Sequence, residues 1–184
     1  AAETILQDFE YTYDPVGNIR RIVDHTFIPS HFANQRVDGD RQFSYDSLYR
    51  LVQASGYDDG PPVDSPGLPH PTDPADRRNY TRRYAYDAGG NLIETVHVRD
   101  GASHTLRLFI DPASNKGVRW KAGDPLPDFN TRFDANGNQR LLQPGQDMHW
   151  NATDELEQVI LVKRPGAVDD AEHYRYSQGT RVHK

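Results

Sequence analysis

The sequence predicts a mainly β protein built from antiparallel β-hairpin repeats that form a curved or spiralling sheet. Two observations carry this prediction. Short segments alternate aromatic and polar residues, which is the period of a half-buried strand, and each segment runs into a turn that begins with an acid or its substitute. No segment of the 184 residues shows the apolar periodicity of an amphipathic helix.

The clearest hairpin is residues 9–23, FEYTYDPVGNIRRIV, in which Tyr11 and Tyr13 point to one face of the first strand. The turn Asp-Pro-Val-Gly places an acid first, proline second and glycine fourth, which suits a type I turn. The Asp14 carboxylate can accept a backbone N–H two residues on. Gly17 can take a positive φ, so a three-residue loop closes with the twist that a hairpin needs.

The same pattern returns along the chain, at residues 43–54, 84–96, 132–142 and 149–162 and as a truncated copy at 174–181. Aligned on the acid or its substitute, the copies fall at Asp14, Asp46, Asp87, Asp134, Asn151 and Ser177. Their spacing is irregular, so the repeat unit is the hairpin itself. The predicted structural turn residues are Asp14, Gly17, Asn18, Asp46, Asp87, Gly90, Asn91, Asp134, Gly137 and Asn138. Tyr49-Arg50 and Asp154-Glu155 replace Gly-Asn in two copies, and we expect those two turns to close differently.

Between the hairpins, residues 25–40 are expected to be a short helix or an irregular crossing loop. Residues 57–80 are rich in proline and are expected to be a long surface loop. Because copies of the hairpin lie on both sides of it, we interpret residues 1–184 as a single repeat region. Further strands are expected at 104–110 and 115–120, and a buried strand at 156–162.

Aromatic residues recur at equivalent positions of the copies, namely Tyr11, Tyr13, Tyr45, Tyr86, Phe133 and Trp150. If these side chains are buried, they form the core between repeats, which is the commoner use of such a stripe. If they are exposed, they would suit stacking on sugars. The second interpretation would make the chain an adhesion module that binds carbohydrate or a cell surface.

Composition and motifs argue against an enzyme. The chain has no cysteine, and its formal charge of −6 is opposite to that of a typical nucleic-acid binder. Each repeated acid stands where turn chemistry already requires one, so we assign no catalytic residue. The histidines lack metal-binding spacing and no nucleotide-binding motif occurs, so we expect no metal, no cofactor and no nucleic-acid partner. No segment has the apolar length of a membrane span, and no signal peptide is visible.

The Tyr-Asp-x-x-Gly-Asn copies resemble the YD repeats of the Rhs family. More narrowly, the segments ETILQDFEYTYDPVGNIRRIVD, FSYDSLYRLVQASG, NYTRRYAYDAGGNLI and ELEQVILVKRPGAVDD resemble the C component of insecticidal Tc toxins, the TccC type. The resemblance covers essentially the whole chain, with the motifs in the same order.

This resemblance implies a structural, non-catalytic segment of a hollow β-shell, secreted as part of a bacterial toxin complex. In that family the shell is assembled with a B component and encloses the protein's own C-terminal toxic domain. The family's self-cleaving aspartyl-protease residues lie near the end of its conserved region, and no acid of this chain is assigned that role. We expect this chain to be an internal piece of a longer protein, whose unpaired strand edges let the isolated piece self-associate.

Overall fold

The computed structural model describes residues 5–32, 34–58, 77–143 and 145–184. These residues divide into two compact units, which are described separately: the first covers the described residues within 5–110 together with 119–121, and the second covers 111–118 and 122–184. Apart from the single-turn helix α1 (Phe129–Arg132), the regular structure of the described residues is β. The predicted fold class, mainly antiparallel β, is therefore confirmed.

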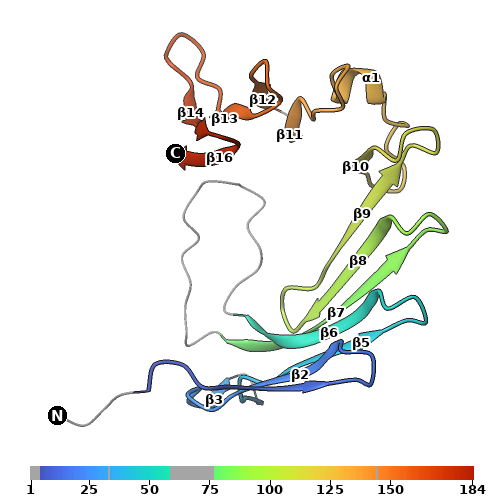
Figure 1. Ribbon diagram of the computed structural model, residues 1–184, viewed down its shortest axis with the longest axis vertical. Helices are drawn as coiled ribbons and strands as arrows, with labels where there is room; N and C mark the ends of the chain where they lie inside the picture. Colours follow the sequence, from blue (N-terminus) through green and yellow to red (C-terminus); the bar gives the residue numbers. More distant parts are fainter. Residues whose placement is uncertain (1–4, 33, 59–76, 144) are drawn as a thin grey trace. The chain divides into compact units, whose positions relative to one another are not determined.

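An eight-stranded sheet contains most of the first unit, in the order β1–β2–β5–β6–β7–β8–β9–β10. Its strands are β1 (Phe9–Tyr13), β2 (Ile19–Asp24), β5 (Arg41–Tyr45), β6 (Leu51–Asp58), β7 (Arg78–Tyr86), β8 (Leu92–Arg99), β9 (His104–Ile110) and β10 (Gly117–Arg119). Neighbours from β1 to β9 pair antiparallel. The turns that join β1 to β2, β5 to β6 and β7 to β8 lie along one edge of this sheet (Figure 1).

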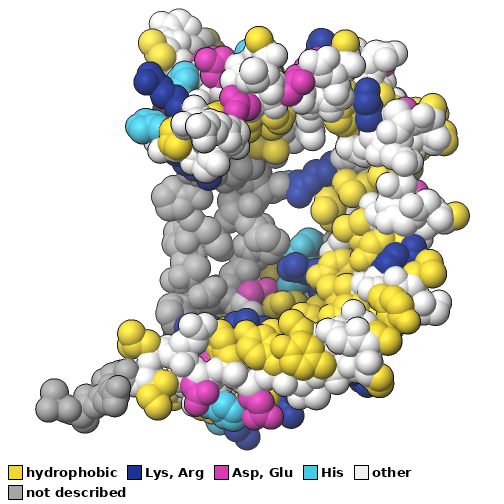
Figure 2. Space-filling model, viewed as in Figure 1, with side chains coloured by type: hydrophobic (Ala, Val, Ile, Leu, Met, Phe, Trp, Pro, Cys, Tyr) yellow, Lys and Arg dark blue, Asp and Glu magenta, His cyan; other side chains and the backbone are white. Residues whose placement is uncertain are grey.

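The sheet of the first unit has a thin core. Val37 and Ala54 are buried, and the Phe27 and Tyr57 rings pack 4.7 Å apart. Apolar side chains gather over the strands of this unit on the face seen in Figure 2. Tyr11 and Tyr13 remain 43% and 55% exposed, because β1 is the last strand of the sheet on its side.

The second unit contains a four-stranded and a two-stranded sheet. The first of these has the order β11 (Leu141–Gln143), β12 (Gln146–Trp150), β13 (Leu156–Val162) and β14 (Asp170–His173), and the second pairs β15 (Arg175–Ser177) with β16 (Thr180–His183). The apolar residues buried here are Phe133, Val159, Ile160 and Tyr174. The expected strand at 156–162 is present, with a buried centre and an exposed Val162 at its end.

Residues 25–40 correct our expectation, because they contain a small hairpin rather than a helix or an irregular loop. Its strands are β3 (Ser30–Phe32) and β4 (Gln35–Val37). Pro29 precedes the first strand, where its missing N–H costs nothing, and Asn34 takes a φ of 61°. The Asn79 side chain then donates to the Arg36 carbonyl at 2.8 Å, which ties β4 to β7.

The expected loop at 57–80 is shorter than predicted. Its ends are strand, since Tyr57 pairs with Asn79 and Asp58 with Arg78. Residues 59–76, and with them most of the proline-rich segment, lie outside the described residues. The strands extend this far because the Tyr57 ring is covered by Phe27 and by the Arg41 guanidinium, 5.9 Å from the ring centre.

Two copies differ from the simple hairpin that the sequence predicts. In the copy at 132–142, α1 replaces the incoming strand, and only the single bridge between Phe133 and Gln139 joins the two sides. The copy at 174–181 was expected to be truncated but is a complete hairpin, because β16 pairs with β15 as far as His183.

Candidate functional site

The predicted turn residues form the same hydrogen-bonded turn in each regular copy. In the first copy, the Asp14 Oδ1 atom accepts the N–H groups of Val16 at 3.1 Å and Asn18 at 2.8 Å, and Oδ2 accepts the Asn18 amide at 2.9 Å. Gly17 has a φ of 91°, which only glycine adopts without strain. The same acid-to-asparagine bonds recur in Asp87–Asn91 and Asp134–Asn138, with Gly90 and Gly137 also at positive φ.

These carboxylates are used by their own turns and do not converge on a shared site. The Asn91 side chain and backbone N–H lower the pKa of Asp87, and the Arg50 backbone N–H does the same for the pKa of Asp46. Such hydrogen bonds favour the ionised form, whereas a general acid would need a raised pKa. Among the described residues, no group of three or more His, Cys, Asp or Glu side chains could hold a metal ion.

The two irregular turns correct another expectation, because they close in the same way as the others. Tyr49 and Asp154 adopt φ values of 60° and 59° in the position of the glycine, at the steric cost of a left-handed conformation. Arg50 supplies the side-chain donor to Asp46 at 2.8 Å.

In the fifth copy the donor and acceptor are exchanged. The Asn151 Oδ1 atom accepts the N–H groups of Thr153 and Glu155, and its amide donates to Glu155 Oε2 at 2.9 Å. The turn therefore needs a matched donor and acceptor pair rather than an aspartate as such.

The structure adds a copy that sequence reasoning missed. Asp111 accepts the Ala113 N–H at 3.1 Å, its own N–H donates to the Lys116 carbonyl at 2.8 Å, and Asn115 takes a φ of 54°. This loop is one residue longer than the other turns, so it does not match the residue spacing by which the repeats were identified in the sequence. The Asp-Pro pair that begins this loop, identical to that of the first copy, was the available signal.

The exchanged pair of the fifth copy yields a rescue experiment. Asp87→Asn should lower the melting temperature, because two amides then face each other across the turn. Adding Asn91→Glu to that variant should recover most of the loss, since it recreates the Asn151–Glu155 arrangement. Thermal denaturation of the parent, both single variants and the double variant is the measurement. Failure of the double variant to recover would show that the side-chain pair does not close the turn.

The aromatic side chains next to the turns link consecutive hairpins. In three copies the residue before the turn acid or asparagine donates a hydrogen bond to the carbonyl five positions after the preceding turn acid: Tyr45 to Ile19 at 2.9 Å, Tyr86 to Leu51 at 2.9 Å and Trp150 to Gln139 at 2.7 Å. Cations cover two rings from the preceding turn: Arg50 lies 4.8 Å from the Tyr86 ring and Lys116 lies 5.4 Å from the Phe133 ring. Phe133 is buried, whereas Tyr11 and Tyr13 of the first copy are exposed.

Removing one of these links tests its contribution. Tyr86→Phe should lower the free energy of unfolding by about 0.5–1.5 kcal/mol, the usual net worth of a hydrogen bond. Tyr13→Phe is the matched control, because the Tyr13 hydroxyl has no hydrogen bond to another described residue. That control should change stability by less than about 0.5 kcal/mol. Equal effects of the two substitutions in urea denaturation would contradict the assignment.

A buried polar cluster in the first unit was not anticipated. It consists of the buried His97 and Arg99, the half-buried Asp58 and Arg82, and the exposed His104. His97 and Arg99 are 0% and 4% exposed; Asp58 forms an ion pair with Arg99 and lies 3.3 Å from His97 Nε2. Arg82 donates to His97 Nδ1 at 3.3–3.4 Å, which favours the tautomer that carries its proton on Nε2, facing Asp58 Oδ2 at 3.3 Å. The His104 ring stacks on His97 at 4.7 Å.

This cluster predicts a loss of stability in acid. Burial lowers the pKa of His97 below its ordinary value of 6.5; Asp58 opposes the shift, and Arg82 and His104 add to it. Below about pH 6.5 the unfolded chain therefore takes up a proton that the folded chain resists, so stability falls as the pH falls. In urea denaturation, the stability advantage of the parent over His97→Gln should shrink between pH 7 and pH 5. A constant or growing advantage would contradict the neutral state of His97.

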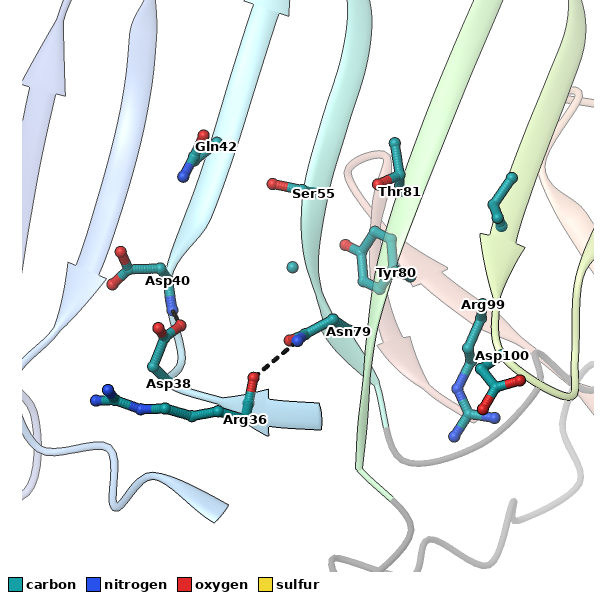
Figure 3. A pocket seen from close by; sticks show the side chains of 12 residues that line it. Arg36, Asp38, Asp40, Gln42, Ser55, Asn79, Tyr80, Thr81, Arg99 and Asp100 are labelled. Carbon is teal, nitrogen blue, oxygen red and sulfur yellow. Dashed lines mark hydrogen bonds between the residues drawn. The ribbon is translucent and has the colours of Figure 1, made fainter. Parts of the chain in front are cut away.

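A shallow polar groove of about 400 Å³ crosses the first unit next to this cluster (Figure 3). Asp38 and Asp40 stand on one side and Arg99 and Asp100 on the other, with Asn79 between them and bonded to the Arg36 carbonyl. The groove contains none of the predicted turn residues. Its mixed charges offer no nucleophile paired with a base, and we assign it no chemistry.

Comparisons with known proteins find sequence similarity to toxin subunits. No protein-family model matches it. It is 38% identical over 184 residues to toxin subunit YenC2 of Yersinia entomophaga and 38% identical over 182 residues to toxin subunit YenC1 of the same organism. Each alignment covers 96% of this chain and 19% of the relative, so the chain spans about a fifth of the length of the curated relatives that it matches.

Solved structures with a similar fold are also toxin proteins. The crystal structure of TcdB2–TccC3 superposes with a TM-score of 0.80 at 39% identity, over 96% of this chain and 9% of that one. The Tc holotoxin pore of Photorhabdus luminescens matches with a TM-score of 0.80 at 39% identity, over 96% and 8%. The chain is thus similar to a part of each of these toxin proteins over nearly its own whole length. Among the described residues, no helix is long and apolar enough to cross a membrane.

Proposed function

We propose that this chain is a wall segment of a Tc toxin C-component-like protein. Its YD-type hairpins contribute to a β-shell that encloses a C-terminal toxic domain, and the segment itself is not catalytic. The observation that carries the proposal is the match to TcdB2–TccC3, which extends over 96% of the chain in both sequence and fold.

The chemistry of the chain supports a structural role. The turn acids accept hydrogen bonds within their own turns, and the aromatic side chains before them bond to the preceding hairpin. These residues therefore act in closing and stacking hairpins. The partners that the proposal implies are a B component, as TcdB2 is for TccC3, and the protein's own C-terminal domain; the complex would act outside the producing cell.

A segment graft tests the proposal. This chain would replace the matched segment of TccC3, and the chimera would be combined with TcdB2. We expect an assembled complex by size-exclusion chromatography and a hypervariable C-terminal region that stays protected from added protease. A chimera with alanine at Asp14, Asp46 and Asp87 is the matched control, which should assemble poorly. A folded chimera that neither assembles nor protects that region would overturn the proposal.

A second candidate function is an adhesion module, and it is favoured by the exposure of Tyr11 and Tyr13. Their rings stack 6.3 Å apart at an interplanar angle of 21° on one face of β1, a geometry that could receive sugars. A glycan array with the parent chain and with Tyr11→Ala and Tyr13→Ala separates the two functions. Binding that is lost in the variants would favour adhesion, and no binding would favour the shell.

A further inference from the structure

The fourth turn contains the one Asn-Gly pair of the sequence, Asn136-Gly137. Glycine has no side chain to shield its backbone nitrogen, so that nitrogen can approach the side-chain carbonyl carbon of the preceding asparagine. Both residues are exposed, and a Cβ atom placed on Gly137 would meet only the Lys116 Cε atom, at 4.0 Å. Neighbouring side chains therefore leave this pair open to attack of the nitrogen on the amide carbon.

The side-chain amide of Asn136 is bonded to the fifth turn. Its Nδ2 atom donates to Asp154 Oδ1 at 2.7 Å, and Asn138 Nδ2 donates to the same oxygen at 2.7 Å. Asp154 stands at the glycine position of its turn and takes a φ of 59°. In the other copies the residue at this position is not an acid. One carboxylate thus bridges the fourth and fifth turns, and the reactive asparagine supplies one of its two donors.

Two hydrogen bonds restrain the reacting groups while the turn is closed. The Gly137 N–H donates to the Asp134 carbonyl at 3.2 Å. The Asn136 amide is held by its bond to Asp154. Both bonds have to open before the nitrogen can attack. Exposed turns open locally at a small part of the global unfolding free energy, so the rate of attack in the folded protein is set by this opening.

We propose that Asn136 is a site of spontaneous deamidation and that its product breaks the bridge to the fifth turn. The Gly137 nitrogen loses its proton to solvent and forms a bond to Asn136 Cγ. The bond from Cγ to Nδ2 then breaks, and ammonia leaves with a proton from water. A second water opens the resulting succinimide ring at either carbonyl, which gives aspartate or isoaspartate. The reaction consumes water, releases ammonia and involves no oxidation or reduction.

The product changes the sign of the contact between the two turns. An amide that donated to Asp154 becomes a carboxylate, so two anions face each other where a hydrogen bond stood. Isoaspartate also adds a side-chain carbon to the backbone of the turn. The link between the fourth and fifth turns is therefore lost in one direction as the protein ages. This inference goes beyond the shell function and does not depend on it.

Peptide mapping tests the reaction. Trypsin releases residues 133–140 as one peptide, in which mass spectrometry distinguishes acid from amide. The folded chain is incubated at pH 8 beside Asp154→Gly, in which glycine suits the positive φ of the fifth turn but the bridge is gone. Asn136 should react about two- to tenfold faster in that variant, the change in opening expected for one lost hydrogen bond. Asn138, followed by glutamine in the same peptide, is the internal control and should remain an amide.

Aspartate at the reacting position isolates the effect of the product. Asn136→Asp should lower the melting temperature of the parent chain, and it should have a smaller effect in the Asp154→Gly background. Val16→Asp in the first turn is the matched control. Val16 also precedes the turn glycine and is exposed, but Tyr49 stands in the second turn where Asp154 stands in the fifth. That control should resemble Asn136→Asp in the Asp154→Gly background.

Four results would overturn the proposal. The first is an unreacted Asn136 in the folded chain under conditions in which the guanidinium-unfolded chain reacts, and the second is equal conversion at Asn136 and Asn138. The third is an equal rate in the parent and Asp154→Gly, because the bridge would then not restrain the amide. The last is a destabilisation by Asn136→Asp that does not depend on Asp154. No toxin component is involved, so these results are independent of the graft.

Discussion

Asparagine in place of Asp58 is expected to lower the free energy of unfolding of the first unit by about 3–5 kcal/mol, because it removes an anion that pairs with a buried cation. The Arg99 side chain is 3% exposed and its Nε atom forms an ion pair with Asp58 Oδ1. Asp58 Oδ2 also lies 3.3 Å from His97 Nε2, so the substitution removes the only acid of the cluster. Urea denaturation at pH 7.5 gives the free energy, and hydrogen exchange should show the loss in β6, β7 and β8.

Asp100→Asn is the matched control for this experiment. Asp100 pairs with Arg78 at 3.3 Å, but the Asp100 side chain is 60% exposed, so its loss should cost less than about 1 kcal/mol. Arg99→Met in the Asp58→Asn background should recover part of the stability, because an apolar side chain can replace a buried charge that has lost its pair with Asp58. An Asp58→Asn variant as stable as Asp100→Asn would show that the Asp58 charge stabilises the fold no more than an exposed ion pair does.

Sequence reasoning succeeded where the physics is local. An acid followed by glycine and asparagine within five residues closes a turn whatever lies around it, and the Asp14, Asp87 and Asp134 turns have the hydrogen bonds expected of them. Strand positions followed in the same way from the alternation of aromatic and polar residues. The fold class needed no more than these two patterns.

It failed where a neighbour decides the outcome. Tyr49 and Asp154 stand where glycine is preferred, and the turns keep the common form with hydrogen bonds that include those from the Arg50 and Glu155 N–H groups. The residues of β3 and β4 have the composition of a loop, yet they pair as strands. The Asn79 side chain of β7 supports this pair by donating a hydrogen bond to the Arg36 carbonyl. Neither the closure of these two turns nor the pairing of β3 with β4 can be predicted from local residue propensities.

The polar cluster around His97 and Arg99 could not be predicted from the sequence for a similar reason. His97 and Arg99 alternate with Val96 and Val98 along β8, and the usual assumption places the charged residues outside. The structure places the two valines no deeper than their polar neighbours: Val98 is 48% exposed and His97 is fully buried. The inversion depends on Asp58, far away in sequence, which supplies the counter-charge.

Alanine in place of Phe133 should lower the free energy of unfolding of the second unit by about 3–5 kcal/mol, the usual cost of removing a buried phenylalanine. Phe133 is 9% exposed, its ring stacks on Phe129 at 6.3 Å, and its backbone forms the single bridge to Gln139. In this copy a helical turn replaces the incoming strand. The packing of the Phe133 ring therefore has to stabilise a hairpin that lacks the strand pairing of the other copies. The fourth turn should therefore depend on the ring more than the others do.

Leu126→Ala is the control for this variant, since Leu126 belongs to the same unit but is 74% exposed and should change stability by less than about 0.5 kcal/mol. Phe133→Leu should retain part of the stability, because leucine fills much of the same volume without the Lys116 contact. Hydrogen exchange of the Asn138 amide, which donates to Asp134, would report whether the turn itself opens. If Phe133→Ala lowered stability while that amide stayed protected, the ring would serve only the core, and the turn acid would close its loop unaided.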